Sequence, residues 1–210
     1  SIFTDTNDNS YEININGELT STSYTIDGLT SSNVKTAILG TNVTNIGVWA
    51  FKQATSLTSI TIPNSVVSIE YGVFEGASGF TSVTIPDSVT SIGNNAFQGA
   101  SGLTSITIPD SVTSIGSSAF YQATSLTSIA IPSSVTAIKN TVFREATSLT
   151  SITIGENSLL ETIGNSAFQL SGLTSITIPD SVTSIGDSVF DGATSLETVH
   201  ISQFDSSLNS

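Results

Sequence analysis

The chain has 210 residues, and its formal net charge at pH 7 is −13 because 17 Asp and Glu outnumber four Lys and Arg. So few basic residues exclude a nucleic-acid-binding surface and disfavour contact with an anionic membrane. The lack of cysteine excludes disulfides and thiolate metal sites, and no stretch approaches the roughly 20 apolar residues of a membrane span.

Residues 1–33 are expected to form an N-terminal lead-in and a β-hairpin cap. Residues 1–10 are polar, whereas Tyr11 to Ile15 alternates between apolar and polar residues. Asn16-Gly17 follows, and Asn-Gly is the strongest short hairpin signal. The return strand would run from Glu18 to about Thr25, and the hairpin would cover the open edge of the repeats that follow.

Residues 34–201 contain about seven copies of a 23-residue unit and a partial eighth copy. The copy that starts at Leu103 shows its parts. Ile106 to Ile108 alternates and is β-branched, which predicts a short strand that Pro109 ends. Val112 to Ile115 predicts a second extended piece. Gly116 is expected to take a positive φ, and a single helical or 3₁₀ turn would follow.

One copy cannot bury its own apolar residues, but stacked copies can, so the constant period predicts a β-rich solenoid. Its core would include a column of stacked phenylalanines, one from each copy: Phe51, Phe74, Phe97, Phe120, Phe143, Phe168 and Phe190.

The copy that starts at Leu149 is irregular. It has two extra residues within Gly155 to Leu160 and lacks one residue after Phe168, where residues 169–172 replace a longer spacer. We interpret this as a bulge that reflects either structural irregularity or a contact with a partner. Residues 202–210 are expected to form a C-terminal tail or partial cap.

The unit L-x-x-I-x-I-P-x-x-V-x-x-I-G-x-x-A-F-x-x-A resembles the BspA-like, or treponemal-type, leucine-rich repeat. The resemblance implies a right-handed coil with a parallel β-sheet on one face and short turns or 3₁₀ pieces on the other. Members of this family are mostly surface proteins of bacteria, protists and viruses, and are associated with adhesion and with binding of partner proteins. The family has no shared catalytic residues, so the resemblance implies no enzyme activity and no cofactor.

Alternation along the first strand of each copy predicts a row of outward hydroxyl groups, because Leu103, Ile106 and Ile108 would point inward and Thr104, Ser105 and Thr107 outward. Repeat proteins commonly bind partners on such a face. The candidate contact residues are Ser59, Thr61, Ser82, Thr84, Ser105, Thr107, Ser128, Ser151, Thr153, Ser175 and Thr177. The alternative is that threonine is simply a good exposed strand residue that repeat duplication has copied.

Three functions remain open at this point. The first is a non-enzymatic recognition or adhesion module that binds a protein or glycan on a cell or virus surface, without inserting into a membrane. The second is a structural segment of a surface filament or viral fibre, which would associate end to end. The third is ice binding, because regular threonine arrays also occur on ice-binding β-solenoids.

Few other residues suggest chemistry. His200 is the sole histidine and is expected to face solvent. Asp87 and Asp110 would stack and could attract a cation, although aspartate after proline is an ordinary turn residue. Trp49 is expected to pack near the cap, with a stacking platform for sugar as the alternative.

The acidic, hydroxyl-rich composition is typical of a secreted protein that is kept soluble by its charge, so we expect an extracellular or cell-surface location, or a virion surface. The chain contains no methionine, including at position 1. This pattern favours a processed or excised piece of a longer protein.

Overall fold

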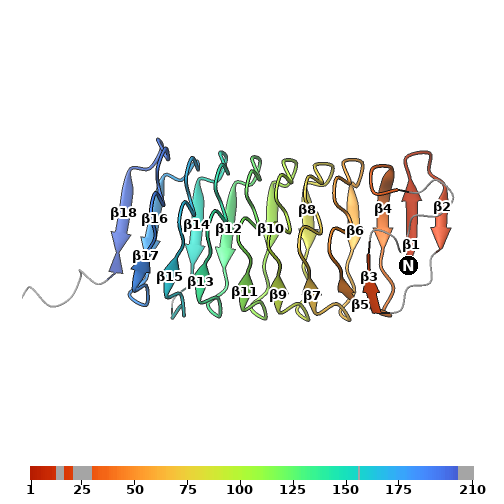
Figure 1. Cartoon of the computed structure of the whole chain (residues 1–210), viewed down its shortest axis with the longest axis horizontal. Coiled ribbons are helices and arrows are strands. Elements are labelled where there is room, and N and C mark those ends of the chain that lie inside the picture. Colours follow the sequence, from red (N-terminus) through yellow and green to blue (C-terminus); the bar gives the residue numbers. More distant parts are fainter. Residues whose placement is uncertain (13–16, 21–29, 156, 203–210) are drawn as a thin grey trace, which may run out of the picture.

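A computed structural model describes residues 1–12, 17–20, 30–155 and 157–202. It is an elongated stack of coils, with the N-terminal strands at one end and β18 at the other (Figure 1). The described residues contain short strands and turns and no α-helix. The prediction of a β-rich solenoid is therefore confirmed.

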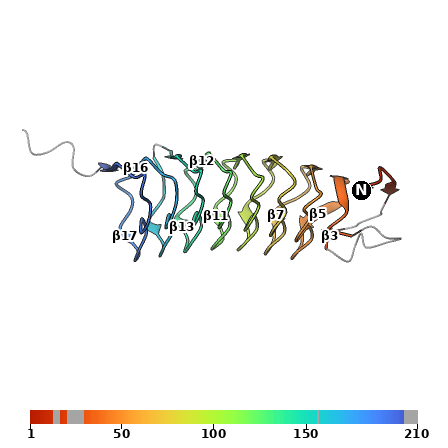
Figure 2. The same cartoon turned by 90° about the horizontal axis from the view of Figure 1, so that it is seen from above.

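Each coil contributes one strand to each of two parallel rows, which lie apart across the thickness of the stack (Figure 2). The first strand row contains β4 (Val34–Ile38), β6 (Ser59–Thr61), β8 (Ser82–Thr84), β10 (Ser105–Thr107), β12 (Ser128–Ile131), β14 (Ser151–Ile154), β16 (Ser175–Ile178) and β18 (Thr198–Ile201). The second strand row contains β3 (Gly17–Leu19), β5 (Val43–Ile46), β7 (Ser68–Ile69), β9 (Ser91–Ile92), β11 (Ser114–Ile115), β13 (Ala137–Ile138), β15 (Thr162–Ile163) and β17 (Ser184–Ile185).

The strand register places equivalent residues of successive coils side by side. Ile106 lies beside Val83, and Ile115 lies beside Ile92, in parallel pairs. These inward side chains are buried. The second extended piece of each repeat is thus also a strand, so the solenoid has two parallel strand rows where one sheet was expected.

The phenylalanine column forms the centre of the core. Neighbouring rings from Phe51 to Phe190 stack with centroids 5.1–5.8 Å apart and with planes at most 17° from parallel. Six of the seven rings are fully buried, and Phe190 is partly buried against the core. Offset stacking of this kind adds to the hydrophobic contribution of each ring.

The third side of each coil is a series of short turns, as expected, but the helical turn that was one alternative does not form there. Left-handed φ values at Ser118 (56°) and Gln122 (58°) interrupt any helix. Ser118, Phe120 and Gln122 donate their N–H groups to carbonyls of the next coil at 2.9–3.0 Å, whereas Ala119 and Tyr121 donate within the turn. The backbone therefore links the coils on this side as well. We call it the turn side.

The expected positive φ at Gly116 is also wrong, since Gly116 is not among the residues with positive φ. The coils approach so closely here that a Cβ atom on Gly116 would lie 2.3 Å from the backbone nitrogen of Asn94. The glycine is needed for this approach and not for a turn conformation.

The N-terminal cap closes the first coil with two antiparallel contacts. Strand β1 (Ile2–Asp5) pairs with β2 (Ser10–Glu12) on one side and with β4 on the other. Phe3 and Leu19 are fully buried beneath the first coil. The cap thus covers both the edge of the first strand row and the open end of the core.

A hairpin is present at the N-terminus, but other residues form it. Residues 1–10, expected to be a lead-in, contribute β1 and the start of β2. Gly17–Leu19 pairs in parallel with β5 and is not a return strand. The remaining parts of the expected hairpin, residues 13–16 and 21–25, lie outside the described residues, as does most of the expected C-terminal tail, residues 203–210.

The insertion in the irregular coil is absorbed as an outward bulge. Leu159 is 59% exposed, while Leu160 is buried at the position that valine takes in regular coils. The buried Ser158 hydroxyl accepts a hydrogen bond from the Leu160 N–H at 3.1 Å. The strands on either side, β14 and β15, keep their parallel pairing.

The carboxylate of Asp5 organises the turn between β1 and β2. The Asn9 side chain donates to it at 2.9 Å, which is the largest cause of a lowered Asp5 pKa. Burial opposes this shift, and the N–H groups of Asn9 and Asn7 and the Tyr11 hydroxyl reinforce it. The ionised carboxylate is therefore stabilised in the folded cap.

We expect Phe120→Ala to reduce the free energy of unfolding by about 3–5 kcal/mol, because it leaves a cavity in the middle of a thin core. Thr107→Ala, at an exposed position of the same coil, should change it by less than about 0.5 kcal/mol. Denaturant unfolding of both variants measures the difference. Equal effects of the two substitutions would contradict the assignment of the core.

Gly116→Ala should destabilise the protein by about 1–3 kcal/mol, because the added methyl group would force neighbouring coils apart. Gly155→Ala is the matched control, since the nearest atom to its added Cβ would be 3.8 Å away. We expect thermal unfolding to show a clear loss only for Gly116→Ala. Similar melting of the two variants would argue against close coil approach at Gly116.

The pKa of Asp5 predicts an acid-sensitive cap. The folded pKa of Asp5 is lowered, so its ionised carboxylate adds to the free energy of unfolding. This stabilisation is fully present at pH values above the unfolded pKa of about 3.9 and is lost as pH falls through the folded pKa. Asp5→Asn should therefore lower the melting temperature at neutral pH. The difference in melting temperature from the unmodified protein should shrink as pH falls below the unfolded pKa of about 3.9. Asp110→Asn serves as an exposed control. A difference that stays constant with acidification would contradict this role.

Candidate functional site

The eleven candidate contact residues all lie on the first strand row, and every one is exposed. We call this set the hydroxyl face; it consists of Ser59, Thr61, Ser82, Thr84, Ser105, Thr107, Ser128, Ser151, Thr153, Ser175 and Thr177. Its position follows from strand alternation, since Val83, Ile106 and Ile129 between them are buried. The expected outward orientation is therefore observed, and the role of these residues in contact with a partner stays a proposal.

Strand register arranges these hydroxyls in two parallel lines. Ser82 lies beside Ser105, and Thr84 lies beside Thr107. The same pairing joins Ser128 with Ser151, whereas Ala130 beside Thr153 leaves one gap in the second line. Neighbouring hydroxyls within a line are thus one strand spacing apart, about 4.8 Å.

Other hydroxyls of the repeat have a structural role. Thr104 donates to the carbonyl of Thr81 at 3.0 Å, and Ser111 donates to the carbonyl of Val89 at 2.7 Å, in each case in the preceding coil. The same bond recurs at the equivalents of Thr104, namely Thr58, Thr127, Thr150 and Thr174, and at the equivalents of Ser111, namely Ser65, Ser88 and Ser134. A third position of the repeat makes a bond of this kind at Thr90, Thr113 and Thr183. Thr104 and its equivalents were expected to belong to the outward face, but their hydroxyls are hydrogen-bonded to backbone carbonyls of the preceding coil.

The hydroxyl face differs from these positions in its hydrogen bonding. Within the described residues, none of its eleven side chains makes a hydrogen bond to another protein group. Each hydroxyl keeps one donor and two acceptor positions for water or a ligand. Sequence alone does not separate the two classes, because both consist of serine and threonine in or near the same short strands.

The hydroxyl face carries no charge. Lys35 and Glu197 lie near its two ends, and Lys35 is paired with Asp8. His200 is exposed on β18 beside Thr177, as expected. A partner on this face would therefore be recognised by hydrogen bonds and shape, with little electrostatic attraction.

The described residues contain no cluster of three or more His, Asp or Glu that could hold a metal ion. Asp87 and Asp110 are exposed. Nor do the described residues contain a helix that is long and apolar enough to cross a membrane.

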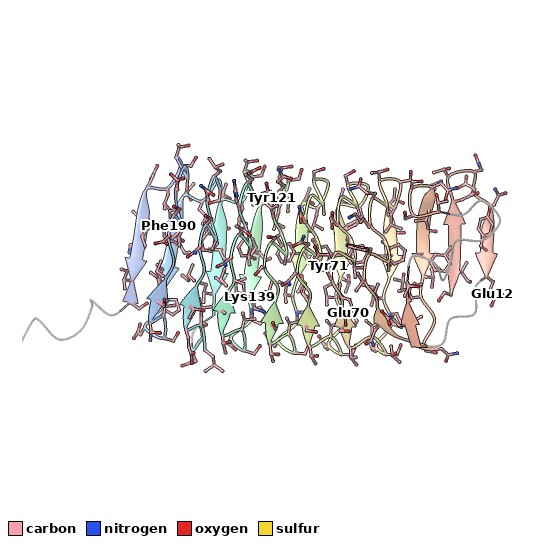
Figure 3. The ribbon with its side chains drawn as sticks, viewed as in Figure 1. Glu12, Glu70, Tyr71, Tyr121, Lys139 and Phe190 are labelled. Carbon is pink, nitrogen blue, oxygen red and sulfur yellow. The ribbon has the colours of Figure 1, made fainter. Side chains whose placement is uncertain are left out.

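Trp49 lies on the turn side of the first coil and is 46% exposed, and its expected packing near the cap stays a prediction. Its φ is 58°, a conformation that is costly for a bulky residue. Tyr71, labelled in Figure 3, contacts the indole edge-on at a centroid distance of 5.8 Å. The Lys52 ammonium lies 4.9 Å from the indole centroid.

Comparison with solved structures finds similar solenoids in bacterial proteins. A leucine rich cell surface protein from Faecalibacterium prausnitzii A2-165 has a TM-score of 0.73 and 32% identity, over 80% of this chain and 47% of that one. A leucine-rich repeat protein from Bacteroides ovatus has a TM-score of 0.65 and 28% identity, over 95% of this chain and 57% of that one. The chain thus spans about half the length of these two proteins.

A leucine rich repeat protein from T. pallidum is similar over 73% of this chain and 74% of its own, with a TM-score of 0.62 and 26% identity. No curated protein matches the chain significantly. A family model described as the BspA type leucine rich repeat region matches in six copies, over residues 22–143 and 68–197. The chain therefore belongs to the BspA-type leucine-rich repeat family.

Proposed function

We propose that the chain is a non-enzymatic extracellular recognition or adhesion module that binds a protein or glycan partner through the hydroxyl face. One observation carries this proposal. The hydroxyls of this face make no hydrogen bonds within the described residues, whereas chemically identical hydroxyls beside them are bonded to the scaffold.

The rigidity of the face supports binding. Its strands are held in register by parallel pairing, and the side chains beneath it are buried. Serine and threonine have short side chains that lose little conformational freedom when a partner binds. A preorganised surface of this kind loses less conformational entropy on binding than a flexible one, so the same contacts give a higher affinity.

The proposed extracellular location is supported by the relatives. The Faecalibacterium protein is named a cell surface protein, and it shares both the family and the fold. A surplus of 13 negative charges is compatible with solubility outside the cell.

A structural role in a filament is the second candidate, and one observation favours it. The last two described coils expose Ile185 on β17 and Val199 and Ile201 on β18, and all four residues of β18 are exposed. Such an end could accept an edge strand of another copy, for example β2 of its cap, by strand pairing. Sedimentation velocity over a range of concentrations separates the candidates, since assembly would favour the structural role.

The test of recognition replaces Thr84, Thr107 and Thr153 together by lysine. The matched control replaces Thr44, Val67 and Thr136, which are exposed at or beside the second strand row and whose side chains are not bonded to the scaffold within the described residues, so that both variants gain the same charge. Probes are a printed glycan array and an array of extracellular proteins. We expect the unmodified protein to bind at least one probe and the hydroxyl-face variant to bind it at least about tenfold more weakly, which is about 1.4 kcal/mol.

The control variant should bind that probe as the unmodified protein does. Equal loss of probe binding in both variants would contradict the proposal that the hydroxyl face is the binding surface. Binding that survives the hydroxyl-face substitutions would do the same.

A further inference from the structure

A groove of about 630 Å³ lies between the turn side and the first strand row. Its residues come from the segment in which each coil leaves its turns and enters the next first-row strand. It extends from Gly99 to Ser195 and so crosses five successive coils. Its lining includes Gln122, Thr124, Glu145, Thr147, Leu170 and Ser171. None of the eleven hydroxyl-face residues lines it, so the groove is a separate surface.

The groove crosses the irregular coil at the point where that coil lacks a residue. The preceding coil has Thr147 and Ser148 between Ala146 and the next leading leucine, whereas only Gly172 separates Ser171 from Leu173. The Gly172 N–H donates to the Ala146 carbonyl at 3.2 Å. A Cβ on Gly172 would lie 2.2 Å from the Thr147 carbonyl oxygen, so no side chain fits here.

Ser171 places an unpartnered hydroxyl in this groove. It occupies the column that is alanine in the other six coils: Ala54, Ala77, Ala100, Ala123, Ala146 and Ala193. Its side chain is 4% exposed, and its Oγ has no hydrogen-bond partner within the described residues. A buried hydroxyl without a partner is destabilising, and alanine would fit the same space. A ligand atom that reached this covered hydroxyl from the groove would satisfy it.

Leu170 is a second locally unfavourable residue in the groove. Its φ is 56°, the left-handed conformation that this position of the repeat also has at Gln53, Gln122 and Glu145 and at Gly76, Gly99 and Gly192. Leu170 is also 43% exposed. This coil therefore differs from its neighbours in having an exposed leucine beside a buried unpaired hydroxyl.

The polar wall of the groove is already ordered. The Gln122 side-chain amide donates to Glu145 Oε2 at 2.8 Å, and the Tyr121 hydroxyl donates to Glu145 Oε1 at 3.3 Å. Arg144, which also contacts the ring of Tyr121, places its Nε 3.4 Å from Glu145 Oε1. Tyr121 is labelled in Figure 3. The groove thus offers a fixed carboxylate and amide beside several hydroxyls.

The chemistry of the lining limits the ligand. No cationic side chain lines the groove, so an anionic ligand is disfavoured. The backbone N–H groups of Gln122, Glu145 and Leu170 all donate to the next coil, at 2.8–2.9 Å. A peptide therefore finds no open strand edge to pair with. A neutral molecule with many hydroxyl groups matches the side chains that remain.

We propose that this groove binds an extended neutral oligosaccharide, with Ser171 as a hydrogen-bonding contact, Glu145 and Gln122 as fixed polar contacts and Leu170 as an apolar contact for a sugar ring. Each coil advances the groove by about 4.8 Å, which is comparable to the length of one sugar residue in an extended glycan, so about four sugars fit along it. The proposal does not depend on the hydroxyl face.

The test titrates the full chain with three neutral tetrasaccharides that differ in linkage and substituent, namely cellotetraose, chitotetraose and maltotetraose, and measures heat of binding. We expect at least one to bind saturably with one site per chain. Ser171→Ala should weaken that binding about three- to tenfold, since one hydrogen bond is lost. Thr147→Phe, which fills the groove from an exposed position, should weaken it more than about tenfold.

Thr136→Phe is the matched control on the far side of the coil and should leave the dissociation constant unchanged within about twofold. Thermal melts establish that each variant is folded. The triple lysine variant of the hydroxyl face should also bind the tetrasaccharide normally, which separates this proposal from the previous one. Four results would overturn it: no saturable binding of any tetrasaccharide, normal binding by Thr147→Phe, loss of binding in the hydroxyl-face variant, or binding of unstructured peptides in preference to sugars.

Discussion

The whole molecule depends on hydrogen bonding between coils that are one repeat apart. Residues of the two strand rows and of the turn side all donate N–H groups to the neighbouring coil, so each position of the repeat lies beside its own equivalent. Side-chain size then has to agree with the local distance between coils. Phenylalanine fits where the rings stack at 5.1–5.8 Å, and only glycine fits where the backbone of Gly116 approaches that of Asn94.

The same constraint divides the many hydroxyl groups into two classes. A threonine such as Thr104 can reach the carbonyl of the preceding coil and so satisfies an acceptor of the scaffold. A threonine such as Thr107, three residues later, stands on the outward face of a strand and reaches no such group. Hydroxyl groups of the same chemical type are therefore divided into some that bond to the scaffold and others that make no hydrogen bond within the described residues.

The repeat could be predicted from sequence because its causes are local and recur. The alternation at Ile106–Ile108 and the spacing of phenylalanines are sufficient to place strands and core. The cap was misassigned because Asn16-Gly17 is a strong local signal, whereas the actual turn depends on one carboxylate, Asp5, that gathers bonds from several later residues. Gly116 was misinterpreted because its constraint comes from another coil, 23 residues away.

The candidate sites were predicted less completely. Strand alternation located the exposed residues of the hydroxyl face, but which hydroxyls are bonded to the scaffold depends on distances between coils. The groove at Ser171 was visible in sequence only as a missing residue. Its unpartnered hydroxyl, and the engaged backbone around it, follow from how that shortened coil meets its neighbours.

The central claim, that equivalent positions of successive coils lie at constant spacing along one axis, can be measured directly. The chain has no native cysteine, so pairs of spin labels can be attached at cysteines introduced at Thr61 with Thr107, Thr153 or Thr177. Pulsed electron paramagnetic resonance should give distances that increase linearly with the number of coils, by about 4.8 Å for each. Distances that do not increase along this series, or that are broadly distributed throughout it, would contradict the stacked-coil account.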